Sequence, residues 1–316
     1  MPLHQRCPPR TPVLLEGPFT TAQGLAAGVT YKQLRGPAYE AVHPRRGVWV
    51  RARTPRDLGF WLAADRLILP PDAALSHATG LVMYGVPLAT TGPRHWSTAT
   101  SGRTRLAVRL HRVNCLGMTT VVRGVRVLSP MDCFVGAASE MSLLNMIQVG
   151  DWLLTHEHIS LAQVRACAST RSAFRIRSAA EWMRIGAESF RETSTRVILR
   201  LSGLPQPEVN MDIVDAAGQF VARGDLPFPR WKLLVEYDGW YHERSAEQRQ
   251  RDLLRREALE RLGWRHVVLT SQDVAHPDRL VGRVWQMLTV CGYRGPAPLF
   301  DQVRWERFLA APQRKR

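Results

Sequence analysis

Short alternating runs of apolar and polar residues dominate the last third of the chain and predict strands there. Three such runs follow one another, and the turn sequence Asp215–Gly218 separates the first two. Helical spacing of apolar residues precedes and follows the group, and Gly263 stands where the second helix should end. The predicted order is α-β-β-β-α-β, with a helix at 186–202, strands Val209–Val214, Gln219–Asp225 and Trp231–Asp238, a helix Ser245–Leu262, a strand Arg265–Thr270 and a helix Pro277–Leu288.

Shorter elements are expected in the N-terminal part. Residues 19–52 predict two helices, the second being Tyr31–Arg35, and then two strands, Tyr39–His43 and Val48–Arg51, around an arginine-containing turn. This pattern is typical of a small winged helix-turn-helix, and a structural cap with a solvated basic turn is the alternative. Residues 55–175 alternate strands with helices, the strands at Trp96–Ala99, Leu106–Arg112 and Thr119–Val127 and the helices after Ser129-Pro130 and at Leu143–Thr155 and Leu161–Ala168.

Together these patterns predict an α/β multi-domain protein. The chain of 316 residues is long enough for two or three domains with cores of their own. We expect a flexible leader at 1–17, a winged helix-turn-helix at 18–54, an α/β middle region at 55–178, an αβββαβ core at 179–292 and a tail at 293–316.

Acidic side chains gather around the third predicted strand of the core. Glu236 and Asp238 are two residues apart and therefore project from the same strand face, while Asp225 lies on the preceding strand. Neighbouring carboxylates repel one another unless a cation lies among them or one keeps its proton. Oxygen ligands of this kind suit Mg²⁺ or Mn²⁺, and a solvated strand end is the alternative interpretation.

The element order and one sequence pattern together resemble a known nuclease family. The pattern is Asp225 … Val235-Glu236-x-Asp238-Gly239-x-x-His242 … Arg251-Asp252 … Gly263-Trp264. Over residues 180–290 it is similar to the PD-(D/E)XK superfamily, in particular to the Vsr-like endonuclease domains. The resemblance implies a restriction-endonuclease-like core that hydrolyses DNA phosphodiester bonds with Mg²⁺ or Mn²⁺.

The resemblance also implies roles for individual residues. Asp225 and Glu236 would bind the metal, Glu192 would assist from the upstream helix, and Asp238 or His242 would handle a proton. The superfamily usually has a lysine where Asp238 stands, and Vsr-like members share this departure. From their spacing alone, one helical turn apart, Arg251 and Arg255 could grip a phosphate or replace the missing lysine as a charge stabiliser, with a solvated basic face as the alternative. For Glu192 the alternative is a surface ion pair with Arg196.

The charge balance points to a polyanionic partner. The formal net charge is +16, and nearly all of the 43 basic residues are arginines, because lysine occurs only at 32, 232 and 315. Arginine excess also arises in GC-rich genomes, but so large a surplus over acids favours nucleic acid, most simply DNA. The residues expected to contact DNA from the helix-turn-helix are Lys32, Gln33, Arg35, Arg45 and Arg46.

A second resemblance covers the N-terminal half. Through Leu75-Ser76-His77-Ala78-Thr79 and Ser129-Pro130-Met131-Asp132, this region resembles the AbiEi family of antitoxins. The resemblance implies an alternative function, a non-catalytic DNA-binding transcriptional regulator with a degenerate nuclease fold, whose partner is a cognate toxin or a second copy of itself. Ser76 is interpreted as a helix-capping serine beside an ordinary histidine. An RNA target stays open.

Cysteine usage and hydropathy bear on the compartment. The five cysteines are scattered, without the spacing of a zinc site or a disulfide framework, so we expect a reducing cytoplasm. Prolines at 8, 9, 12 and 18 interrupt the first 19 residues, which argues against a signal peptide. The chain has no run of about 18 apolar residues, so no membrane partner is expected.

Overall fold

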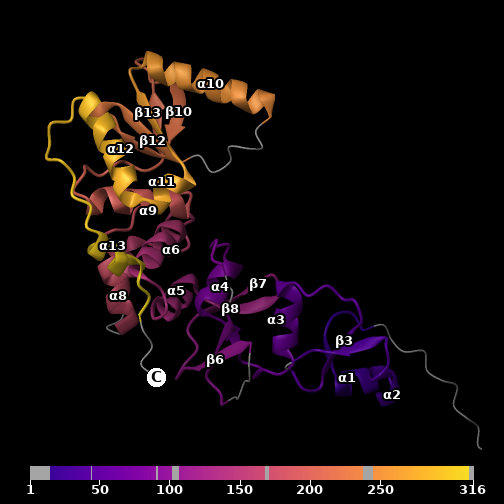
Figure 1. The fold of residues 1–316 in the computed structure, drawn as a ribbon. Helices are drawn as coiled ribbons and strands as arrows, with labels where there is room; N and C mark the ends of the chain where they lie inside the picture. Colours follow the sequence, from indigo (N-terminus) through magenta and orange to yellow (C-terminus); the bar gives the residue numbers. More distant parts are fainter. Residues whose placement is uncertain are drawn as a thin grey trace, which may run out of the picture. The chain divides into compact units, whose positions relative to one another are not determined.

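The chain folds into a mixed α/β structure made of two compact units. The computed structural model describes residues 15–43, 45–89, 92–101, 107–167, 171–237 and 245–312, and its contacts divide the chain into units 1–133 and 134–316 (Figure 1). The general prediction of an α/β multi-domain protein is therefore confirmed. The division falls at 133/134, and the finer domain boundaries stay predictions.

The N-terminal unit begins with two short helices and a small antiparallel sheet. The strand order is β1-β3-β2, and the threonines before the two helices each form a capping box with a glutamine three residues on. Phe19, Val29 and Leu34 form a small core between the helices and the sheet. The elements are β1 Phe19–Thr20, α1 Thr21–Ala26, α2 Tyr31–Leu34, β2 Tyr39–Ala41 and β3 Val48–Arg51, close to the predicted ranges.

A buried carboxylate joins this sheet to the rest of the unit. Asp65, near the end of α3 (Leu58–Arg66), is fully buried and accepts hydrogen bonds from Arg45 Nε at 2.9 Å and Arg94 Nε at 2.6 Å. Trp96 Nε1 donates to the same carboxylate at 3.3 Å. The assignment of Arg45 to DNA is therefore wrong, because its guanidinium is buried as the partner of an internal charge. The neighbouring Arg46 is exposed.

A five-stranded mixed sheet with the order β6-β5-β4-β8-β7 forms the rest of the N-terminal unit. Helix α4 contacts β5 and β8. The segment expected as one strand at Thr119–Val127 is a hairpin, because Arg123 and Gly124 adopt φ of 49° and 76° and reverse the chain. The elements are β4 Ala74–Leu75, α4 His77–Met83, β5 Arg94–Thr98, β6 Val108–Arg112, β7 Thr119–Val122 and β8 Val125–Leu128.

Helix α5, Pro130–Ala138, begins as predicted, because Ser129 Oγ accepts a hydrogen bond from Asp132 N at 3.1 Å. In the C-terminal unit, helix α6 packs against α8, α9 and α13. The bounds are α6 Leu143–Thr155, α7 Leu161–Arg165, α8 Arg171–Ala180, α9 Phe190–Leu201 and α13 Gln302–Leu309.

A second internal ion pair holds this helical layer together. Asp151 on α6 accepts from Arg196 Nη2 at 2.6 Å and from Thr193 Oγ1 at 2.8 Å, and both charged side chains are fully buried. A surface pair between Glu192 and Arg196 was the alternative expectation, and it is wrong, since Arg196 points into the α6–α9 interface. The pair fixes α9, which also contacts β12, α11 and α12.

The rest of the C-terminal unit follows the predicted order, with one extra strand where a turn was expected. Strands β9 and β10 form a hairpin, and β11, β12 and β13 form a separate sheet in which β12 is central (Figure 1). Pro227 lies within β11 instead of in a turn, and a 3₁₀ turn at Pro229–Trp231 delays the start of β12. The bounds are β9 Met211–Val214, β10 Phe220–Gly224, β11 Leu226–Phe228, β12 Leu233–Tyr237, α10 Ala246–Arg261, β13 Arg265–Leu269, α11 Ser271–Ala275 and α12 Pro277–Val290.

Helices cover the central strand from two directions. Leu259 of α10 and Trp264 pack with Ile213, Ala222 and Leu234 into one buried cluster, which joins α10 to β9, β10 and β12. Helices α9 and α12 also contact β12. Within the described part of the chain, no helix has both the length and the apolar character needed to cross a bilayer.

The Asp65 network makes a prediction about stability. Asp65→Asn removes the charge that compensates two arginines, and breaking a buried pair on one side costs about 3–5 kcal/mol. Chemical denaturation should therefore show a large loss for the N-terminal unit. Glu40→Gln is the control, because it breaks an exposed pair with Arg56 and should cost at most about 1 kcal/mol. Equal losses in the two variants would show that the Asp65 network does not stabilise the unit.

Candidate functional site

Strand pairing brings the two predicted metal-binding carboxylates together. Strand β11 runs antiparallel to β12 with Leu226 opposite Val235, so one further step places Asp225 opposite Glu236. Both side chains line one cavity of about 340 Å³. The other lining residues are Tyr237, Asp252, Arg255, Arg256, His266 and Val268.

Alternation along β12 explains which side chains reach this cavity. Leu234 packs toward α10 in the buried cluster, and Glu236, two residues later, lies on the same face. In the parallel pairing of β12 with β13, His266 stands beside Leu234 and Val268 beside Glu236. Helix α10 therefore meets the same strand face and supplies the basic side chains of the cavity.

Glu236 forms an ion pair with a helix arginine. The Arg255 Nη2 atom lies 2.5 Å from Glu236 Oε1 and also donates to the backbone oxygen of Arg223 at 2.6 Å. The Glu236 side chain is 18% exposed and that of Arg255 34%, so the pair is partly desolvated. Arg255 is thus positioned beside the carboxylate that is expected to bind a metal.

Asp225 is held in a less compensated environment. Burial, followed by the nearby charges of Glu192 and Glu236, raises the pKa of Asp225 to about 7, and Arg255 only partly offsets these effects. Tyr237 N donates to Asp225 Oδ2 at 3.3 Å. At neutral pH this carboxyl group is therefore divided between its charged and neutral forms.

Glu192 lies outside the cavity and acts on Asp225 through its charge. Its carboxylate is buried at the start of α9, where Oε2 accepts hydrogen bonds from Glu188 N at 3.0 Å and Asn210 Nδ2 at 2.9 Å. It is not among the residues that line the cavity, but its charge contributes to the raised pKa of Asp225.

The remaining predicted residues are spread over the molecule. Asp238 and His242 lie outside the described residues. Arg251 is exposed on α10 and does not line the cavity. In the N-terminal unit the side chains of Lys32, Gln33, Arg35 and Arg46 are exposed, although Gln33 Oε1 is engaged by Thr30 N in the capping box.

His266 was missed by the sequence analysis and lies in the cavity. Burial lowers its pKa, although the charge of Glu236 opposes this shift, so the imidazole is neutral at neutral pH. The strand Arg265–Leu269 was predicted, and only its parallel register with β12 shows that His266 faces the carboxylates.

Comparison with known proteins gives a partial match. No family model matches the chain. It is similar to two curated proteins of Mycobacterium tuberculosis, the uncharacterized proteins MT2308 of strain CDC 1551 / Oshkosh and Rv2248 of strain ATCC 25618 / H37Rv. Each is 32% identical over 99 residues, a match that covers 31% of this chain and 36% of the relative. The chain therefore matches little more than a third of the relatives' length.

The raised pKa of Asp225 predicts how stability depends on pH. The folded protein keeps a proton that the unfolded chain releases above its ordinary pKa of 3.8, so stability should fall as the pH rises from about 4 through 7. Asp225→Asn should flatten this slope and stabilise the protein near pH 8 by about 1–3 kcal/mol. Denaturation across this pH range measures both effects. Asp278→Asn, at an exposed acid, should keep the wild-type slope.

Proposed function

We propose that the protein is a Mg²⁺-dependent DNA endonuclease that hydrolyses phosphodiester bonds and carries an N-terminal DNA-binding module. The convergence of Asp225 and Glu236 from adjacent strands on one polar cavity carries this proposal. The observed order α9, β9, β10, β11, β12, α10, β13 agrees with a restriction-endonuclease-like core if β11 is taken as an extra strand segment.

The side chains of the cavity suit a hard divalent cation. Asp225 and Glu236 supply only oxygen donors, and the raised pKa of Asp225 reflects a carboxyl group whose charge is incompletely compensated. Asp225 and Glu236 would hold the ion, and Glu192 would add negative charge from α9. A bound Mg²⁺ supplies Lewis-acid polarisation of a phosphate and a lower pKa of bound water.

Basic and neutral side chains of the same cavity have separate tasks. Arg255 lies at the cavity with a guanidinium that can turn from Glu236 toward an entering phosphate, so it would bind and orient the substrate. His266 is neutral and can accept a proton, a task that the family resemblance gives to Asp238 or His242.

The N-terminal elements would supply most of the DNA affinity. The two capped helices and the strands after them fit a winged helix-turn-helix. Its exposed basic residues, Lys32, Arg35 and Arg46, would contact the phosphate backbone. The net charge of +16 supports nucleic acid as the partner.

One observation favours the second candidate, a non-catalytic antitoxin-like DNA-binding regulator acting with a toxin or a second copy of itself. The Arg255–Glu236 ion pair satisfies the carboxylate without a metal. An internal pair of this kind is also what a nuclease fold that has lost its metal would keep. Aspartate at 238, where the superfamily usually has lysine, agrees with this alternative.

Plasmid cleavage tests the nuclease proposal. Purified protein with supercoiled DNA and Mg²⁺ or Mn²⁺ should nick or linearise it, and EDTA should prevent this. Glu236→Gln and Asp225→Asn should each lower the cleavage rate by about 100-fold or more, since each deletes a charge that the metal needs. Glu257→Gln, at an exposed position of α10, should cleave like wild type.

The same assay separates the two candidates. Asp238→Lys restores the charge pattern usual in the superfamily: it should create or raise activity if the site has decayed, and destroy activity if Asp238 is a working group. If Glu236→Gln and Asp225→Asn match wild type in cleavage and in their response to Mg²⁺, the site assignment is wrong and the regulator is the better account.

DNA binding gives an independent prediction. Replacing Lys32, Arg35 and Arg46 together by alanine should weaken duplex binding and lower the salt slope of log K by about 2–3, because each phosphate contact contributes about 0.9. Binding isotherms at several salt concentrations measure this slope. A triple variant at the exposed Arg165, Arg279 and Arg294 of the C-terminal unit has the same charge and should retain more affinity. Equal affinity in the two variants would remove the role of the N-terminal residues.

A further inference from the structure

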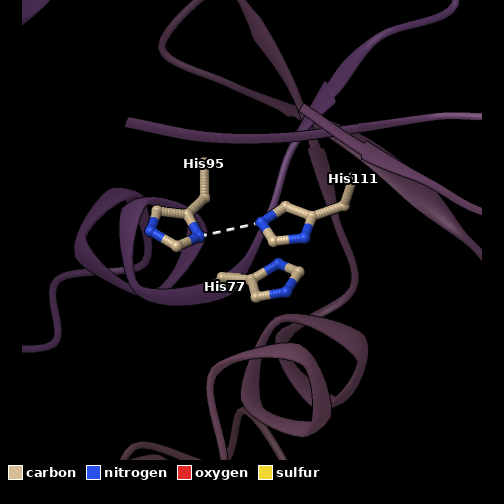
Figure 2. A group of neighbouring side chains, drawn as sticks. All are labelled: His77, His95 and His111. Atoms are coloured by element: carbon tan, nitrogen blue, oxygen red, sulfur yellow. Dashed lines mark hydrogen bonds between the residues drawn. The ribbon is translucent and has the colours of Figure 1, made fainter. Parts of the chain in front are cut away.

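Three histidines from separate elements converge beside the five-stranded sheet of the N-terminal unit. His77 begins α4, His95 lies on β5 and His111 lies on the edge strand β6, and Figure 2 shows the three rings grouped together. One ring nitrogen from each lies within 4.8 Å of the others. His95 Nδ1 and His111 Nε2 are 3.0 Å apart, and the His77 ring stacks on that of His111 with centroids 3.7 Å apart.

Strand register and backbone contacts hold the three residues in place. Strands β5 and β6 are parallel with Ser97 beside His111, so His95 and His111 lie on the same sheet face. Ser76 N donates to His95 O at 3.1 Å, which sets the start of α4 beside β5. His95 N donates to Thr79 Oγ1 at 2.9 Å, and His95 itself is only 7% exposed.

We propose that His77, His95 and His111 form a binding site for one divalent transition metal ion of the zinc class. His95 Nδ1 and His111 Nε2 are 3.0 Å apart in a hydrogen bond whose donor is set by the tautomer, so the acceptor lone pair already faces the other ring. In a tetrahedral site with metal–nitrogen bonds of 2.0–2.1 Å, ligand nitrogens are separated by about 3.3 Å. The two nitrogens need to move apart by only a few tenths of an ångström. All three rings need to turn so that their lone pairs meet at the metal.

The donor type sets the class of metal. Imidazole nitrogen suits Zn²⁺, Co²⁺, Ni²⁺ and Cu²⁺, whereas Mg²⁺ prefers oxygen. When a metal binds, the proton of the His95–His111 hydrogen bond moves to the opposite nitrogen of its own ring. Each neutral ring can then donate a nitrogen lone pair to the metal. Three protein ligands leave a fourth position open to water or another group.

Two further observations at His77 point to a constrained ligand. Its φ of 52° is a left-handed conformation that is uncommon for a non-glycine residue, and residues held in such conformations are enriched at ligand sites. Its Nδ1 lies 3.0 Å from Ser76 Oγ, which accepts a hydrogen bond from Ser97 Oγ at 2.9 Å. In the tautomer whose Nδ1–H donates to Ser76, this hydroxyl helps to orient the His77 ring.

Metal titration of the full chain tests the proposal. Protein freed of any affinity tag and stripped with a chelator should bind one Co²⁺ with visible ligand-field absorption, and Zn²⁺ should displace it. His77→Ala and His111→Ala, at the two partly exposed positions, should each weaken Zn²⁺ binding by about 100-fold or more, since losing a ligand should cost at least as much as the roughly 10–100-fold loss when a residue that orients a ligand is removed. His43→Ala removes an exposed histidine of the same unit and should leave the affinity unchanged.

X-ray absorption at the zinc edge of wild type needs no variant and should show three imidazole nitrogens without sulfur. Failure of wild type to retain zinc, a sulfur ligand, or unchanged affinity in both His77→Ala and His111→Ala would overturn the proposal. Glu236→Gln should keep the Co²⁺ spectrum, so failure of the proposed nuclease site and failure of this site give different results.

Discussion

A carboxylate buried inside a protein needs a cation or a proton, and this constraint organises both units of the chain. Asp65 meets it with Arg45 and Arg94, which lie 20 and 29 residues away in sequence, and so connects the first sheet, helix α3 and strand β5. Asp151 meets it with Arg196 across the α6–α9 interface. Each pair links elements that are distant in sequence, and removing either partner would leave the other charge buried and uncompensated.

Asp225 obeys the same rule in a different way. The guanidinium that stands beside it, that of Arg255, is bound to Glu236, so Asp225 is compensated mainly by keeping a proton up to a pH of about 7. Three acids and two arginines therefore line a cavity in which net charge can change when a cation or a phosphate enters. Burial raises the pKa of Asp151 as well, so what distinguishes Asp225 is that it lines a cavity together with Glu236, and this is why the site is a candidate for function.

Local signals in the sequence predicted the elements well, while partners distant in sequence escaped it. Capping residues and alternation placed helices such as Leu143–Thr155 and the order around β12, because these depend on neighbours in sequence. Arg45 was misplaced because an arginine in a turn is usually exposed, and only the approach of Asp65 buries it. The position of His266 beside the carboxylates depends on the register of parallel strands β12 and β13, and the pairing of His95 with His111 near His77 depends on that of β5 and β6. No local pattern reveals these registers.

The two groups of potential ligands differ in chemistry as well as in position. Oxygen donors in the C-terminal unit suit a hard ion that exchanges readily, whereas three imidazoles in the N-terminal unit suit a borderline ion that is held more firmly. A firmly held ion would join the start of α4 to strands β5 and β6, next to the anchor that Asp65 provides at Arg94 and Trp96. The metal and the Asp65 network would then both stabilise β5. This structural role does not depend on whether the protein is a nuclease. The histidine site is thus independent of the one question on which the two functional candidates differ, namely whether Arg255 or a metal neutralises Glu236.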